Sequence, residues 1–379
     1  MTVAIISSRF PRFGAETFLG TELEGLRPHF ARVIVVPVRQ SLFSLRTVAD
    51  ALRTACRHPR RTAGVLRTLF GRPGRPSVFF KNVLVLPRAL AVARTIEREK
   101  VDHIHAYWLS APATVALVAS EVTGIPWSSS AHRWDIYENN LLERKAQKAA
   151  FLRAISERGA RDLRERIGAS DRAKVARVRV GVSVPAIGAR AGVGPLRVIC
   201  AANLIEQKGH LDLLAALGIL ALRKVAFRCD IAGSGPLYAK LARRIEELRL
   251  GDRVTLQGRV AHDGLLESLQ RGEYDVAVLA SRSASGGRME GIPVALMEAM
   301  AAGLPCVATD SGSIPELLDA ATGIVVPAGD ARRIANALER LANSADLRRR
   351  LGGAARERVE REFNIARTGP ALAELIKRS

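Results

Sequence analysis

The chain has 379 residues, of which 48% are hydrophobic and 25% are charged, an ordinary globular balance for a length that predicts two domains. No stretch of about 18 residues is both apolar and free of charge, which excludes a membrane-spanning helix of that kind. The 58 Lys and Arg outnumber the 37 Asp and Glu, and the formal net charge of +21 indicates an anionic partner or an unusually basic surface.

The first predicted element is a buried strand at Val3–Ser7. The run that begins at Met1 is apolar and has no basic segment before it, so it lacks the pattern of a signal peptide. A loop spanning Phe10–Phe18 follows and leads into a helix. Its Gly14 allows the backbone to approach a ligand closely, and Glu16 lies near the helix start, although a plain strand–helix turn explains the same residues.

Residues 46–100 concentrate the positive charge, because they hold 13 Lys and Arg against only Asp50, Glu97 and Glu99, which leaves about half of the chain's excess in this segment. Apolar residues recur there at helical spacing, at Leu45, Val48 and Leu52 and again at Val65, Leu66, Leu69 and Phe70. A basic amphipathic helix fits an anionic membrane surface, where each Lys or Arg contributes about 1 kcal/mol. A solvated basic surface is the alternative. Nucleic acid is not expected as a partner, because no helix-turn-helix, zinc finger or aromatic-studded basic strand is evident.

Short apolar runs alternate with longer helical patterns along the whole chain. Such strands, separated by helices, predict parallel, doubly wound sheets and an α/β fold. The predicted strands of the first half are Val3–Ser7, Val33–Val38, Asp102–Tyr107, Trp127–Ala131, Phe151–Ile155 and Lys174–Val182. Those of the second half are Leu196–Ala202, Phe227–Ala232, Val254–Gln257, Tyr274–Ala280, Cys306–Thr309 and Gly323–Val326.

Two histidines lie near the carboxyl ends of predicted strands in the first half. His105 is near the end of the strand 102–107, and His132 follows the strand 127–131. Doubly wound folds bind ligands at these strand ends. His132 is therefore a candidate site residue, whereas His105 either lines a cleft or is a structural core residue.

The segment Val184–Pro195 is rich in Gly, Pro and Ala and has no periodicity, so it is the best candidate for a linker. It predicts two Rossmann-like domains, at residues 1–184 and 185–358, that face each other across a cleft with the ligand at the strand ends. The remaining residues, 359–379, form a predicted C-terminal helix that crosses back to the first domain.

The cysteines are predicted to be small core residues. The four of them, Cys56, Cys200, Cys229 and Cys306, match neither a zinc-binding spacing nor a disulfide framework, and three lie in apolar strand-like runs. This usage is consistent with a reducing cytoplasm.

The second half carries two carboxylates eight positions apart, Glu290 and Glu298, around the start of a predicted helix. Pro293 suits the first helical position, and Gly303 suits the helix end. Glu290 is thus expected in the loop before the helix and Glu298 about one and a half turns inside it. Free N–H groups at such a helix start suit a diphosphate.

These motifs resemble the retaining glycosyltransferases of family 4, also called group 1, which have the GT-B fold. The resemblance covers roughly residues 196–330. It lies in the two glutamates and in the segments 299–310, Ser313–Leu317, Gly323–Pro327, Gly233–Leu237 and Gln257–Val260. In the first half, Phe10–Phe18 and Ser130–Tyr137 resemble the polysaccharide or colanic-acid branch of the same family.

By this resemblance Glu290 contacts the donor sugar, Glu298 contacts the ribose, and Lys208 contacts the donor diphosphate. Asn203 stands where many members have arginine, so Arg288 either substitutes for it or is a solvated loop residue. Pro293 stands where glycine is common and removes one backbone donor.

The expected site has a catalytic, a donor-binding and an acceptor-side part. The expected catalytic residues are His132, Lys208 and Glu290; the donor-binding residues are Asn203, Lys208, Gly233, Gly235, Gly258, Arg288, Gly291, Ile292 and Glu298; the acceptor-side residues are Gly14, Glu16 and His105.

The resemblance implies retaining transfer of a sugar from a UDP- or GDP-type donor to a saccharide or lipid-linked saccharide, in exopolysaccharide, lipopolysaccharide or glycolipid synthesis. No metal and no cofactor beyond the nucleotide sugar is expected, because no Asp-x-Asp pair stands at a predicted strand end. The expected location is the cytoplasm, peripheral on the inner face of the plasma membrane. A nucleotide-sugar epimerase on the same scaffold and a non-catalytic basic binding protein remain alternatives.

Overall fold

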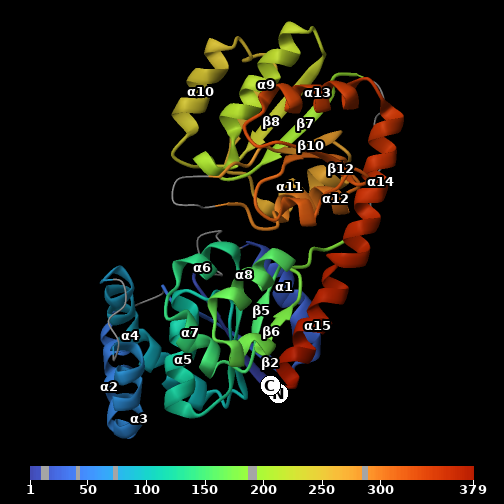
Figure 1. Cartoon of the computed structure of the whole chain (residues 1–379). Helices are drawn as coiled ribbons and strands as arrows, with labels where there is room; N and C mark the ends of the chain where they lie inside the picture. Colours follow the sequence, from blue (N-terminus) through green and yellow to red (C-terminus); the bar gives the residue numbers. More distant parts are fainter. Residues whose placement is uncertain (10–16, 40–42, 71–75, 187–193, 284–288) are drawn as a thin grey trace. The chain divides into compact units, whose positions relative to one another are not determined.

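The computed structural model describes residues 1–9, 17–39, 43–70, 76–186, 194–283 and 289–379 as an α/β protein. The chain divides into two compact units (Figure 1). Unit 1 comprises Met1–Gly181 together with Ala366–Ser379, and unit 2 comprises Val182–Ile365. The sequence predicted domain boundaries after residues 184 and 358. The units of the structure instead meet after residues 181 and 365, so that residues 359–365 belong to unit 2 and not to the segment that returns to unit 1.

The sheet of unit 1 has six parallel strands in the order β2-β1-β3-β4-β5-β6. The strand order reverses direction between β1 and β3, which is a topological switch point. The strands are β1 (Thr2–Ser7), β2 (Arg32–Pro37), β3 (His103–Ala106), β4 (Trp127–Ala131), β5 (Leu152–Ala154) and β6 (Val175–Arg177).

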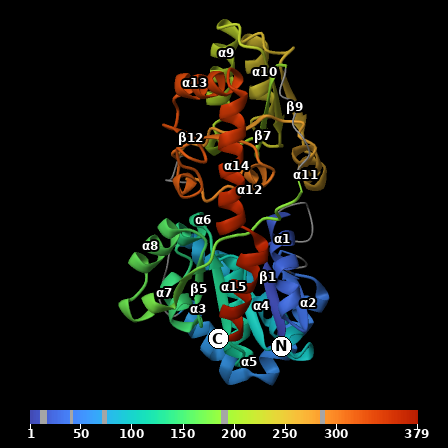
Figure 2. The same cartoon turned by 90° about the vertical axis from the view of Figure 1, so that its right-hand side faces the viewer.

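Alternate residues of β1 enter two different cores of unit 1. Ala4 and Ile6 join one cluster of buried residues, whereas Val3 and Ile5 join another together with Leu372 of the C-terminal helix. Side chains of a strand alternate between faces, so helices cover both faces of this sheet. Figure 2 shows the C-terminal helix α15 lying along unit 1, where its apolar residues complete the second core.

The helices of unit 1 include an outer group, in which α4 packs against α5 and α2 packs against α4 (Figure 1). The α-helices are α1 (Thr17–Leu26), α2 (Leu45–Arg57), α3 (Pro59–Phe70), α4 (Pro76–Arg98), α5 (Ala111–Thr123), α6 (Arg133–Glu138), α7 (Leu142–Lys148), α8 (Glu157–Arg166) and α15 (Ile365–Lys377). Two 3₁₀ helices, η2 (Arg27–His29) and η3 (Ala169–Lys174), complete the described elements of this unit.

The sheet of unit 2 also has six parallel strands, in the order β12-β11-β10-β7-β8-β9. Its switch point lies between β7 and β10. The strands are β7 (Leu196–Ala201), β8 (Phe227–Ala232), β9 (Val254–Gly258), β10 (Val276–Leu279), β11 (Cys306–Thr309) and β12 (Gly323–Val326). The helices are α9 (His210–Leu222), α10 (Tyr238–Glu247), α11 (His262–Gln270), α12 (Val294–Ala301), α13 (Ala331–Ala342) and α14 (Ala345–Glu362), with the 3₁₀ helices η4 (Glu206–Lys208) and η5 (Ile314–Glu316).

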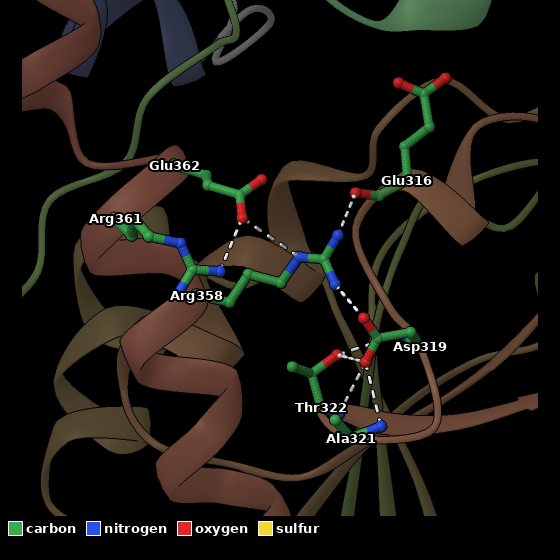
Figure 3. Close-up of polar contacts among 7 residues, drawn as sticks. All are labelled: Glu316, Asp319, Ala321, Thr322, Arg358, Arg361 and Glu362. Carbon is green, nitrogen blue, oxygen red and sulfur yellow. Dashed lines mark hydrogen bonds and ion pairs between the residues drawn. The ribbon is translucent and has the colours of Figure 1, made fainter.

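Arg358, near the C-terminal end of α14, connects this helix to η5 and to the loop between η5 and β12 by a hydrogen bond and an ion pair (Figure 3). Its guanidinium donates to the carbonyl of Glu316 over 3.1 Å and forms an ion pair with Asp319. Asp319 also accepts backbone hydrogen bonds from Ala321 and Thr322, at 3.0 and 3.1 Å. Burial opposes the shift, but the Thr322 hydroxyl, the Ala321 N–H and the nearby guanidinium together lower the pKa of Asp319. The end of α14 is therefore held to unit 2 before the chain passes into unit 1.

Each of the twelve predicted strands is present, with ends that differ by a few residues, and the α/β prediction is confirmed. Cys200, Cys229 and Cys306 are buried as predicted, on β7, β8 and β11, whereas Cys56 is exposed on α2.

Candidate functional site

The candidate site residues of unit 2 lie in loops at the carboxyl edge of its sheet. The loop after β7 carries Asn203 and Lys208, the loop after β8 carries Gly233 and Gly235, and Glu290 lies between β10 and α12. β7 and β10 are neighbours at the switch point, which is where doubly wound sheets bind their ligands.

Three glycines let these loops approach one another more closely than any other residue would. A Cβ atom at Gly209 would lie 1.8 Å from the carbonyl oxygen of Ala280, and one at Gly312 would lie 1.9 Å from that of Glu290. A Cβ atom at Gly233 would lie 1.9 Å from the carbonyl oxygen of Ala202. Gly209 and Gly312 also have positive φ angles of 65° and 63°, which favour glycine. These close backbone contacts therefore restrict the conformation of the loops that carry Lys208 and Glu290.

Lys208 and Glu290 form the centre of the site, although 82 positions separate them in sequence. The Lys208 Nζ atom donates to Glu290 Oε2 over 2.6 Å, and the hydroxyl of Ser281 donates to the same oxygen over 2.9 Å. The two charged side chains keep 18% and 10% of their surface exposed. The ion pair is thus largely enclosed, yet a ligand can still reach both groups.

Helix α12 begins at Val294, and Pro293 occupies the position before it with an extended backbone. The expectation that Pro293 is the first helical residue was wrong by one position, because its ψ of 117° is not helical. No side chain caps this helix start. Its first backbone N–H groups therefore face the loop that carries Gly291 and Ile292, where the helix dipole favours an anion.

Glu298 is the fifth residue of α12, one and a half turns inside, as predicted. Its carboxylate accepts a hydrogen bond from His262 Nε2 at 2.7 Å. This bond raises the pKa of His262, against the opposing effect of partial burial. The pair forms a second polar position beside α12.

The remaining donor-side predictions fall into different environments. Asn203 is exposed and its carbonyl accepts from the Ile205 N–H at 2.8 Å. Gly235 packs against Leu204, since a Cβ atom there would lie 2.5 Å from the Leu204 carbonyl oxygen. Gly258 has a φ of 67° and accepts from the Gly233 N–H at 2.7 Å. Arg288 lies outside the described residues, as do Gly14 and Glu16 of the acceptor side.

His132 lies at the carboxyl end of β4 in unit 1, directly before α6. Its ring centroid is 4.0 Å from that of Trp108, and neither ring nitrogen has a hydrogen-bond partner among the described residues. Burial, with the charge of Arg153 as a lesser cause, lowers the pKa of His132 to about 3. The imidazole is therefore neutral at physiological pH, with one donor and one acceptor free for a ligand.

His105 does not fit the expectation that it lines a cleft. It is fully buried in β3, where its ring nitrogens bond the hydroxyls of Ser128 and Ser130 at 2.7 and 2.9 Å. Burial is the main reason that its pKa is well below the usual value. With both nitrogens satisfied and no exposed surface, His105 is a structural residue of the sheet.

Several residues beside the site were not recognised from the sequence. Ser281, His262 and Gly312 each contact one of the two predicted glutamates, and His210 lies next to Lys208 at the start of α9. Burial, together with the charge of Lys208, lowers the pKa of His210 to about 4. In the sequence, only their positions could have indicated these residues, because Ser281 follows a predicted strand and His210 is the first residue of a helix.

Comparisons with known proteins agree with this architecture. Residues 190–358 match the model of the family described as glycosyl transferases group 1. WcaL of Escherichia coli, named for colanic acid biosynthesis, is 38% identical over 211 residues, which are 54% of this chain and 52% of WcaL. The amylovoran biosynthesis glycosyltransferase AmsK of Erwinia amylovora is 40% identical over 185 residues, 48% of this chain and 45% of AmsK. The chain thus matches about half the length of these relatives.

Solved structures resemble the whole chain. HepE of Anabaena, in a complex with UDP, is covered completely with a TM-score of 0.74 at 18% identity. The sucrose-phosphate synthase of Thermosynechococcus elongatus is covered to 98% with a TM-score of 0.76 at 17% identity. Both comparisons cover all of this chain and show a common fold. The chain therefore has the GT-B fold, and its residues 190–358 match the family model of the glycosyl transferases of group 1.

Proposed function

We propose that the protein is a retaining glycosyltransferase that moves a sugar from a UDP- or GDP-type donor to a saccharide or lipid-linked saccharide acceptor. The observation that carries the proposal is the Lys208–Glu290 pair, 2.6 Å apart, in the matched family region and next to the uncapped start of α12. The names of WcaL and AmsK support a role in exopolysaccharide synthesis, and lipopolysaccharide or glycolipid synthesis would use the same chemistry.

In this proposal the donor diphosphate binds between Lys208 and the first turn of α12. The Lys208 ammonium has three N–H donors and uses one on Glu290, so it can also donate to a phosphate oxygen. The helix start adds backbone N–H groups and a partial positive charge. As the bond to the sugar breaks, negative charge grows on the leaving phosphate, and these fixed groups stabilise it.

The carboxylates of Glu290 and Glu298 accept hydrogen bonds from hydroxyl groups of the donor. Ser281 and Lys208 orient Glu290 toward the sugar, and His262 orients Glu298 toward the ribose. We assign the neutral imidazole of His132 to the transfer step as well. In the retaining scheme the leaving phosphate accepts the acceptor's proton on the same face, so no protein nucleophile takes part.

The reaction should need neither a metal ion nor a cofactor other than the nucleotide sugar. Among the described residues, no three His, Cys, Asp or Glu side chains are grouped so that they could hold an ion. The proposal itself rests on Lys208 and α12, which supply the positive charge that a divalent cation would otherwise bring.

The test is nucleotide release from UDP- and GDP-sugars with a panel of saccharide acceptors, in the presence of EDTA. We expect acceptor-dependent release by the wild-type chain, and release about 10²–10³-fold slower for Glu290→Gln, which retains the shape of the side chain but replaces one accepting oxygen with an NH₂ donor. Circular dichroism should be unchanged. Normal turnover by the variant would remove Glu290 from the site, and metal-restorable loss in EDTA would overturn the metal-free scheme. Conversion of the donor into another nucleotide sugar in the absence of any acceptor would indicate an epimerase instead.

The proposal extends to the cytoplasmic face of the plasma membrane, to which unit 1 would bind through residues 46–100. More than half of the large hydrophobic side chains exposed among the described residues lie between Phe43 and Leu84. Leu45, Val48 and Leu52 on α2 are 91%, 40% and 62% exposed, while the buried residues of that helix are Thr47, Ala51 and Thr54. Helix α2 thus presents its apolar side outward.

Helix α4 adds four exposed apolar side chains, Phe79, Phe80, Val83 and Leu84. By its length and apolar composition α4 reaches the range of a membrane span, although it contains Lys81 and Arg88 and is therefore not an uncharged run. However, 44% of that stretch is buried inside the structure. Arg46, Arg57, Arg60 and Arg67 are exposed on α2 and α3. Apolar groups flanked by arginines fit the interface of an anionic bilayer.

A triple variant in which Arg57, Arg60 and Arg67 are each replaced by Ser should bind phosphatidylglycerol vesicles about a hundredfold more weakly, at roughly 1 kcal/mol for each arginine. Replacing Leu45, Leu52 and Phe80 with Ser should also weaken it, because these side chains would enter the lipid. Vesicle sedimentation measures both. Leu222→Ser in unit 2, at a side chain that is 86% exposed, is the matched control. Undiminished binding by both triple variants would leave the segment as solvated surface.

A further inference from the structure

Unit 1 contains a cavity of about 650 Å³ at the carboxyl ends of β1, β2 and β3, the switch point of its sheet. Its walls come from the strand ends, from α4 and from α6. Its lining includes Lys81 and Leu84 on α4, Trp134 and Glu138 on α6, and Trp108 and Ser110 after β3. The volume lies within the range of small-molecule sites.

Glu138 gives this cavity a hydrogen-bond acceptor that has no partner. One carboxylate oxygen pairs with Lys81, but the other, Oε2, is buried without a hydrogen bond among the described residues. Only 9% of the Glu138 side chain is exposed. A buried carboxylate oxygen is costly to leave unsatisfied, so a hydroxyl or N–H donor of a ligand would be stabilised there.

Two of the chain's three tryptophans line the same cavity. Trp134 is 51% exposed, although tryptophan side chains are on average largely buried. Trp108 lies between the cavity and His132, whose ring centroid is 4.0 Å away. The loop that carries Trp108 is held by Lys145, which donates to the carbonyls of Leu109 and Ser110 at 2.7 and 2.8 Å.

We infer that this cavity binds the pyranose ring of the acceptor, with Trp134 against its C–H face, and with Glu138 and Lys81 on its hydroxyls. The inference rests on the proposed function and adds to it the place and residues of acceptor recognition. A sugar ring has an apolar face and a rim of hydroxyls, which matches an indole surface beside a carboxylate and an ammonium. The contact of Trp108 with His132 brings this ligand next to the histidine assigned to the transfer step.

The cavity also adjoins the exposed apolar surface of unit 1. Leu84 lines the cavity and is 51% exposed, and it belongs to the same face of α4 as Phe80. A saccharide carried on a lipid could therefore enter from the bilayer side. The binding residues themselves recognise only the sugar.

The test is a titration of the full chain with methyl glycosides of common hexoses, N-acetylhexosamines and uronic acids, in which tryptophan fluorescence reports binding. Trp127 is fully buried, so a change in emission would report mainly on Trp108 and Trp134. We expect saturable changes with at least one glycoside, at the millimolar dissociation constants typical of single sugar rings. Glu138→Gln should weaken binding about tenfold and Trp134→Ala about fivefold.

Glu143→Gln on α7, which removes a carboxylate from an exposed position, is the matched control and should bind as the wild type does. Thermal shifts with UDP- and GDP-sugars are measured on the same samples. If a nucleotide sugar binds and no glycoside does, or if Glu138→Gln binds glycosides normally, the assignment of this cavity is wrong while the proposed function stands. If no nucleotide sugar binds either, both fail. A saturable fluorescence response to inorganic phosphate, with no response to any glycoside, would identify an anion site instead.

Discussion

Replacing Lys208 with Met is expected to lower kcat for sugar transfer by about 10²–10³-fold, which corresponds to about 3–4 kcal/mol of transition-state stabilisation. Lys208 is the charged donor next to α12, and its Nζ lies 2.6 Å from Glu290 Oε2. The variant loses the charge that stabilises the leaving diphosphate, and Glu290 loses the group that orients it. Steady-state kinetics with a fixed nucleotide sugar would measure the change.

Lys240→Met is the matched control, because Lys240 is an exposed residue on α10 of the same unit. Lys208→Arg should recover part of the rate, since it restores the charge but not the geometry of a single ammonium. A double variant with Glu290→Gln should be hardly slower than either single variant, because residues that act as one unit are not additive. Independent, multiplicative losses would show that Lys208 and Glu290 do not act on the same group.

The local part of the donor site could be predicted from the sequence. The positions of Glu290 in a loop and of Glu298 within α12 follow from the spacing of Pro293 and Gly303, because helix starts and ends depend on neighbouring residues. The strands could be predicted because fully buried parallel strands are continuous apolar runs. Gly303 ends α12 with a φ of 74°, as its residue type suggested.

The partners of these residues could not be predicted, because they come from distant parts of the chain. Lys208 and Glu290 are 82 positions apart, and Gly312 is needed only because the Glu290 backbone passes beside it. Two histidines at similar strand ends also differ in a way that sequence does not show. His105 faces the serines of the neighbouring strand, whereas His132 has already left its strand.

Helix α2 shows a similar limit of periodicity. The spacing of Leu45, Val48 and Leu52 correctly predicted a helix with one apolar side, but periodicity does not say which side packs inward. The small residues Thr47, Ala51 and Thr54 are buried instead, and α2 packs against α4. An apolar side that is free in the folded chain is then available to a membrane.

Replacing Arg153 with Met should destabilise unit 1 by about 3–5 kcal/mol, because it leaves the carboxylate of Glu22 buried without a cation. Arg153 on β5 and Glu22 on α1 form a two-bond ion pair at 2.7 and 2.8 Å, with side chains that are 0% and 3% exposed. The guanidinium also donates to the carbonyls of Val178 and Arg179, at 2.8 and 2.7 Å. It thus joins β5, the strand next to the edge strand β6, to α1 and to the segment after β6.

Denaturant unfolding followed by tryptophan fluorescence would measure this change in unit 1 alone, because Trp108, Trp127 and Trp134 all belong to that unit. Arg32→Met is the matched control. Its ion pair with Glu99 is equally short, at 2.7 Å, but Arg32 is 56% exposed, so the expected loss is about 0–1 kcal/mol. Combining Arg153→Met with Glu22→Leu should recover much of the stability, because no charge is then left buried. If the double variant were as unstable as the single one, the carbonyl contacts of Arg153, and not its pairing with Glu22, would account for the loss.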